Sequence, residues 1–112
     1  MAVFTLTLHT HIPDDAEPLT EAKAVEVGAL FGALLNGVVR IQGPDDVVVR
    51  PLAYRVRVHE RGALLDLRCT APGAGLAALG WRLTLRQMLR ESTLFDGWSV
   101  DVGPVSTVHG DS

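Results

Sequence analysis

Apolar and polar residues alternate at the start of the chain. Within residues 2–9 (AVFTLTLH), Phe4, Leu6 and Leu8 occupy every second position, which is the period of a strand with one buried face. The pattern predicts a first strand whose apolar side faces a core. The other side of this strand carries threonines and a histidine, so we expect it to be polar.

Two longer segments carry apolar residues at helical spacing. The first helix is expected after Thr20, whose hydroxyl can cap it, and ends at about Leu35. The following Asn36-Gly37 tolerates the left-handed conformation that often ends a helix. The second helix is expected over roughly residues 73–91. Its predicted core stripe consists of Ala77, Ala78, Trp81, Leu85, Met88 and Leu89.

Between the two helices, a short apolar segment at residues 38–42 (VVRIQ) is a strand candidate, and residues 46–60 are rich in strand-forming side chains. Pro51 interrupts this run, and because proline donates no ladder hydrogen bond it indicates a bulge or a strand edge. A two-residue turn at residues 61–62 would create a hairpin in which Val58 faces Leu65. The apolar residues then share one side of the hairpin, and most charged residues share the other.

A last strand at residues 98–103 (WSVDVG) completes the order β-α-β-β-β-α-β. Strands that are apolar on one side need helices on that side only. We therefore predict an α+β two-layer sandwich, with a mostly antiparallel sheet of about five strands and two helices on one face. This architecture resembles the ferredoxin-like plait with one extra strand. We expect a single domain over residues 1–104 and a flexible tail over residues 105–112.

Composition narrows the functional classes. A net charge of -3 argues against nucleic-acid and anionic-membrane partners, because both need an excess of lysine and arginine on one face. The single Cys69 can form no intramolecular disulfide, and the N-terminus lacks the basic region of a signal peptide. We expect a soluble, cytoplasmic protein without a cofactor.

The segment HTHIPDD (9–15) raises the possibility of a metal site. His9 and His11 have the parity of the polar strand face, and His59 lies on the polar side of the hairpin. Three neutral imidazoles suit zinc or copper, and Asp14 or Asp15 could add an oxygen ligand. The preferred interpretation is a solvated strand end without metal, and the three histidines are the alternative.

Two other motifs have structural explanations. GAGLAA (73–78) matches the dinucleotide pattern G-x-G-x-x-A, but that motif belongs to a parallel sheet buried on both faces. Its glycines are more consistent with a tight strand-to-helix turn. Cys69 shares the parity of the hairpin's apolar residues, so we expect a buried, inert thiol rather than a nucleophile.

Arginines form the remaining candidate surface. The first group lies on the polar side of the predicted sheet, where Arg55 would oppose Arg68. Its members are Arg55, Arg57, His59 and Arg68. The second group is a stripe on the second helix, flanked by Leu79 and Leu83. Its members are Arg82, Arg86 and Arg90. Arginine pairs bidentately with carboxylates and is enriched in interfaces.

These observations favour a non-enzymatic protein-interaction or accessory domain. It would act through homo-oligomerisation or by docking to a protein partner, because the sequence offers no convincing nucleophile or metal constellation. The alternative is a domain that binds a small molecule, an anion or a metal, or a small enzyme, using the open polar face of the sheet. Neither hypothesis assigns a catalytic residue.

Overall fold

Five strands and two helices follow one another in the predicted order. A computed structural model describes residues 2–43 and 46–108. Its elements are β1 (Ala2–His11), α1 (Glu21–Asn36), β2 (Ile41–Gln42), β3 (Val48–His59), β4 (Gly62–Ala71), α2 (Ala74–Glu91), the 3-10 turn η2 (Thr93–Phe95) and β5 (Ser99–Thr107). Thr20 caps α1 as expected, since its side chain accepts a hydrogen bond from the Lys23 amide.

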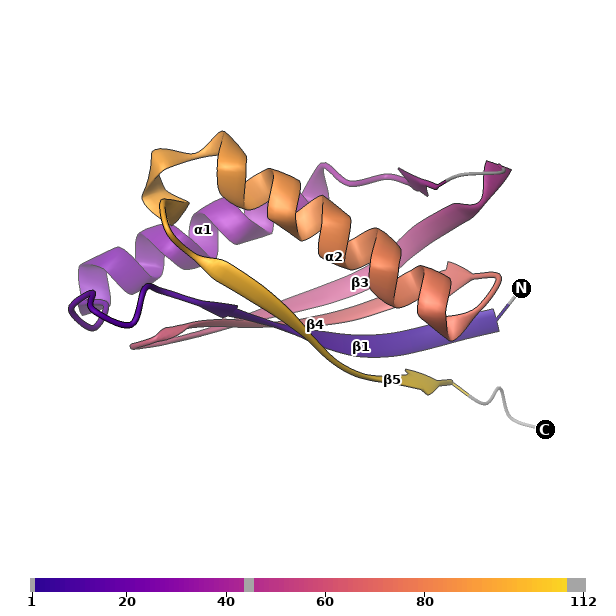
Figure 1. Cartoon of the computed structure of the whole chain (residues 1–112), viewed down its shortest axis with the longest axis horizontal. Coiled ribbons are helices and arrows are strands. Elements are labelled where there is room, and N and C mark those ends of the chain that lie inside the picture. The colour runs from indigo at the N-terminus through magenta and orange to yellow at the C-terminus, as the bar shows by residue number, and fades with distance from the viewer. Residues whose placement is uncertain (1, 44–45, 109–112) are drawn as a thin grey trace.

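The strands form one antiparallel sheet in the order β2-β3-β4-β1-β5. Both helices lie on the same side of this sheet (Figure 1). The α+β class, with five antiparallel strands and two helices, is confirmed. The two-layer sandwich and the ferredoxin-like topology are not confirmed, because the sheet curls into a half-barrel and its strand order differs. The short β2 adds a strand beyond β3.

The core lies between the helices and the apolar side of the sheet. Alternate residues of β1, namely Phe4, Leu6 and Leu8, are buried there. From the helices, the buried residues are Val27, Phe31, Leu35, Ala77, Trp81, Leu85, Met88 and Leu89. The predicted stripe of the second helix is therefore confirmed, apart from Ala78, which is half-buried. Periodicity alone identified the buried positions of β1 and α2, because each of these elements buries one face.

The predicted register of the β3–β4 hairpin is wrong by two residues. Val58 faces Ala63 rather than Leu65, so Glu60 and Arg61 form the turn and Gly62 already belongs to β4. Gly62 has φ +152°, and a Cβ there would collide with the Thr10 carbonyl. Because the shift is an even number of residues, every side chain keeps its predicted face.

Two strands have features at one end that concern the predicted bulge and the predicted tail. The β3–β4 register shifts between Pro51 and Ala53, which confirms the predicted bulge. β5 extends to Thr107, where it pairs with Phe4, so residues 105–107 belong to the sheet rather than to the expected tail. The end of that tail, residues 109–112, lies outside the described residues.

Candidate functional site

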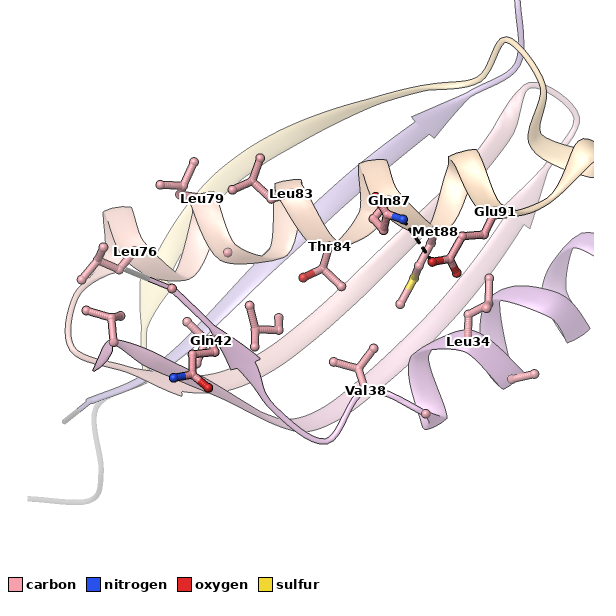
Figure 2. A pocket seen from close by; sticks show the side chains of 17 residues that line it. Leu34, Val38, Gln42, Leu76, Leu79, Leu83, Thr84, Gln87, Met88 and Glu91 are labelled. Carbon is pink, nitrogen blue, oxygen red and sulfur yellow. Dashed lines mark hydrogen bonds between the residues drawn. The ribbon is translucent and has the colours of Figure 1, made fainter. Parts of the chain in front are cut away.

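A groove of about 560 Å³ lies beside α2, on its side facing β2 (Figure 2). We call it the apolar groove. Its walls come from the C-terminal half of α1, the segment that follows it, β2, the start of β3 and one side of α2. The apolar side chains that line it are Leu34, Val38, Ile41, Val47, Val49, Leu76, Leu79, Leu83 and Met88.

One glycine and two leucines of α2 shape the apolar groove. Gly80 faces Ile41, and a Cβ at Gly80 would lie only 3.3 Å from the Ile41 Cγ2 atom. The glycine therefore lets α2 approach the β2 edge closely. Leu79 and Leu83, one turn apart on α2, remain 48% and 54% exposed. Large apolar side chains with this exposure are costly to leave in water, so they favour a bound occupant.

Few polar side chains line the apolar groove. They are Gln42, Thr84, Gln87 and Glu91. Figure 2 shows Gln87 and Glu91 near the end of α2, where the Gln87 amide donates a hydrogen bond of 3.2 Å to Glu91. Thr84 and Met88 point from α2 toward the open space. A mostly apolar wall with a few polar groups is typical of small-molecule sites.

The sequence patterns do not predict the apolar groove, although Leu79 and Leu83 stand out beside the arginine stripe of the second helix. Both leucines fall outside the core stripe of α2, and this was the one signal available. The wall opposite them comes from residues 33–43 and 47–49. How far this wall stands from α2 depends on tertiary packing, which hydrophobic periodicity does not report.

The structure separates the three histidines of the metal hypothesis. The His9 and His11 rings stack with their centroids 6.4 Å apart, and the His11 Nε2 atom lies 3.4 Å from the Asp101 carboxylate. His59 instead accepts a hydrogen bond from the Arg61 amide through Nδ1. His59 and His11 each pair with Gly62, so β4 lies between them. Within residues 2–43 and 46–108, no three His, Cys, Asp or Glu side chains are grouped to hold a metal ion.

The rest of the HTHIPDD segment is held by the hairpin turn. The Arg61 guanidinium donates hydrogen bonds to the carbonyl oxygens of Ala16, Pro13 and Asp14 at 2.7, 3.0 and 3.3 Å. The Arg61 carbonyl in turn accepts from the Ile12 amide. Arg61 therefore binds the backbone of this loop, and the Asp14 and Asp15 residues remain exposed.

On the open face of the sheet, Asp66 is the centre of a polar cluster. Arg57 donates two hydrogen bonds to its carboxylate, at 2.8 and 3.1 Å, and the Thr7 hydroxyl donates a third at 2.9 Å. The hydrogen bonds from Arg57 hold the pKa of the Asp66 carboxyl below its usual value, against the opposing effect of burial, and Thr7 contributes further.

The expected opposition of Arg55 and Arg68 does not occur. Because of the two-residue register shift, Arg55 faces Asp66 and Arg68 faces Ala53. The Asp66 carboxylate also offsets part of the repulsion between Arg55 and Arg57, since both arginines act on it. Arg55 and Arg68 are exposed, and neither makes an ion pair with another described residue.

The helical arginines lie on a different surface. Arg82, Arg86 and Arg90 line a second cleft, between α2 and the start of β5, on the helix side of the sheet. Arg55, Arg57, His59 and Arg68 are on the hairpin's polar side. The two arginine groups that the sequence suggested therefore do not combine into one site.

Cys69 and the GAGLAA motif carry no site chemistry in this fold. Cys69 is fully buried, and burial raises the pKa of its thiol, although the neighbouring Trp81 indole partly offsets the effect. β4, the strand before the glycines, pairs antiparallel with both of its neighbours. β1 also separates β4 from β5, the strand that follows α2, so the motif does not lie between the adjacent parallel strands that a dinucleotide site requires.

Comparisons with known proteins identify no relative. No family model matches the chain, and neither the curated proteins nor the solved structures contain a match. Among the residues that the structure describes, no helix combines the length and the apolar character needed to cross a membrane.

Proposed function

We propose that this chain is a non-enzymatic binding domain whose apolar groove holds a small apolar molecule with one polar end. One observation carries the proposal: an open groove of about 560 Å³ with a mainly apolar wall lies between two helices and a sheet edge. Sites for small ligands range from roughly 300 to 1,000 Å³ and bury most of the ligand's surface.

The polar groups of the apolar groove favour binding over catalysis. Glu91 is the only titratable side chain among the described residues of its wall, and it already accepts a hydrogen bond from Gln87. General acid–base chemistry needs a group placed and tuned for proton transfer. Gln42, Thr84 and Gln87 instead offer amide and hydroxyl groups, which would orient the polar end of a ligand.

A titration with the neutral fluorescent probe N-phenyl-1-naphthylamine tests this proposal. We expect the wild-type protein to enhance probe fluorescence saturably. Leu83→Glu places a charge in the wall without disturbing the core, and we expect it to weaken probe binding roughly tenfold or more. Val25→Glu is the matched control, because Val25 is 72% exposed on α1 and does not line the apolar groove.

Equal probe affinity in the wild type and Leu83→Glu would contradict the proposal. So would a loss of binding in Val25→Glu of the same size, because the effect would then follow from added charge anywhere on the surface. Thermal melting of both variants checks that each one remains folded.

A second candidate function is docking of a protein partner, or of a second copy of this chain, on the open face of the sheet. The exposed Arg55 and Arg68, without ion pairs among the described residues, support it, because arginine is enriched in interfaces. Light scattering coupled to size-exclusion chromatography tests self-association. A monomer in which Arg55→Glu changes neither elution nor partner capture would exclude this face.

We also infer a distant relation to the ferredoxin-like plait. What supports it is the element order: if β2 is set aside, the remaining elements follow β-α-β-β-α-β, as in that motif. The relation would concern architecture alone, because such folds host many functions.

A further inference from the structure

A row of three arginines overhangs one edge of the sheet. Arg82, Arg86 and Arg90 are spaced four residues apart on α2, so they lie on one side of the helix. Together with residues 95–100 they line a cleft of about 500 Å³, which we call the arginine cleft. It opens toward β5 at one end of the sheet, whereas the apolar groove opens toward β2 at the other end.

No ion pair involves this row within the described part of the chain, although one carboxylate, Asp96, lines the same cleft. All three arginines are exposed, and none makes an ion pair or a side-chain hydrogen bond to another described residue. Arg57, in contrast, is paired with Asp66. Three free guanidinium groups on a protein of net charge -3 form a local positive surface that suits an anionic partner.

The strand below the arginines has a free edge. β5 is the last strand of the sheet order and pairs only with β1, so its other edge offers unpaired backbone groups in the described structure. A bulge follows Val102, where Gly103 and Pro104 stand opposite the single residue Thr7. Proline has no amide hydrogen, and it therefore ends the usable edge. Residues 99–102 remain open to a further strand.

The spacing of the arginines along α2 matches the spacing of alternate side chains along an extended peptide. Four residues of helix rise about 6 Å, and two residues of strand rise about 6.6 Å. α2 and β5 run side by side in opposite directions (Figure 1). A strand added beside β5 would present every second side chain toward the helix. Carboxylates at alternate positions would therefore have nearly the same spacing as the arginines.

We propose that the arginine cleft and the edge of β5 together form a docking site for an extended acidic peptide of a partner protein. The peptide adds a strand at residues 99–102 and directs alternate Asp or Glu side chains to Arg82, Arg86 and Arg90. Backbone hydrogen bonds supply affinity in this mode of recognition, and the side-chain contacts supply specificity. This site is separate from the apolar groove.

Fluorescence anisotropy with a labelled peptide of alternating glutamate and valine tests the proposal. We expect saturable binding that weakens as salt is added, because arginine–carboxylate contacts at an exposed rim are screened. Two control peptides separate the contributions: one with glutamine in place of glutamate, and one with proline in place of valine. The second keeps the charge but cannot donate backbone hydrogen bonds at those positions, and we expect both to bind roughly tenfold more weakly or worse.

Protein variants locate the site. Arg86→Glu reverses the central charge, and we expect it to weaken binding roughly tenfold or more. The matched control is Arg50→Glu, at another exposed arginine, on β3, which two strands separate from β5. This control should bind the peptide as the wild type does. Backbone amide shifts on peptide addition should be largest at residues 99–102.

Three outcomes would overturn the proposal. They are equal binding by Arg86→Glu and the wild type, equal binding of the proline peptide, and amide shifts confined to other strands. The second would show a site for charge alone rather than for an added strand. Because Arg86 does not line the apolar groove, Arg86→Glu should leave binding of the neutral probe unchanged, so the failure of one proposal is distinguishable from the failure of the other.

Discussion

At the scale of single residues, the ionisation of Asp66 is coupled to the stability of the fold. Its carboxylate accepts hydrogen bonds from Arg57 and Thr7, and its pKa is lowered mainly by Arg57. The charged form is therefore favoured in the folded state. The resulting stabilisation is complete above the unfolded pKa of about 3.9 and is lost as the pH falls through the lower folded value.

We expect Asp66→Asn to lower the free energy of unfolding at neutral pH by about 0.5–1 kcal/mol, a modest amount because the ion pair is partly solvated. The difference between wild type and variant should shrink as the pH falls below about 4, since the wild-type carboxyl then takes up a proton. Urea denaturation at pH near 7 and near 3 measures both differences. A gap that stays the same at the two pH values would show that the Asp66 charge does not stabilise the fold.

At the scale of elements, the β3–β4 hairpin depends on Gly62. Its φ of +152° and the nearby Thr10 carbonyl exclude a Cβ. We expect Gly62→Ala to destabilise the protein by about 2 kcal/mol or more, because it combines backbone strain with a steric clash. The measurement is the free energy of unfolding from urea denaturation.

Gly75→Ala is the control for this substitution. Gly75 lies within α2 with nothing near its missing Cβ, so alanine should stabilise the protein by about 0.5–1 kcal/mol. If Gly62→Ala is as stable as Gly75→Ala, the hairpin does not need the conformation described for Gly62.

The hairpin also shows how far the sequence predicts the structure. Element order and face assignment follow from local periodicity, so β1, both helices and the polar side of the hairpin were predicted. The register was not, because it depends on which residues form the turn, and Gly62 serves β4 rather than the turn. The apolar groove depends on how closely Gly80 lets α2 approach β2, and alternation carries no information about this distance.

At the scale of the whole molecule, α2 separates two surfaces of opposite chemistry. One side of it presents leucines to the apolar groove, and the other presents arginines to the edge of β5. Between them, the buried stripe of α2 packs against the sheet. One helix can therefore serve two binding sites only if the core beneath it holds it in place.

Cys69 reports on the integrity of that core. It lies on β4, the central strand of the sheet, opposite Phe4 of β1, and is fully buried. Its thiol pKa is raised by burial, and the thiolate is the reactive form. Access to Cys69 requires the sheet and helices to separate, which is close to global unfolding.

We expect an aromatic disulfide reagent to modify Cys69 very slowly in the native protein and at once in the urea-unfolded protein. Complete modification of the native protein within minutes would mean that β4 opens without global unfolding, and α2 would then lack the rigid support that the two proposed sites require.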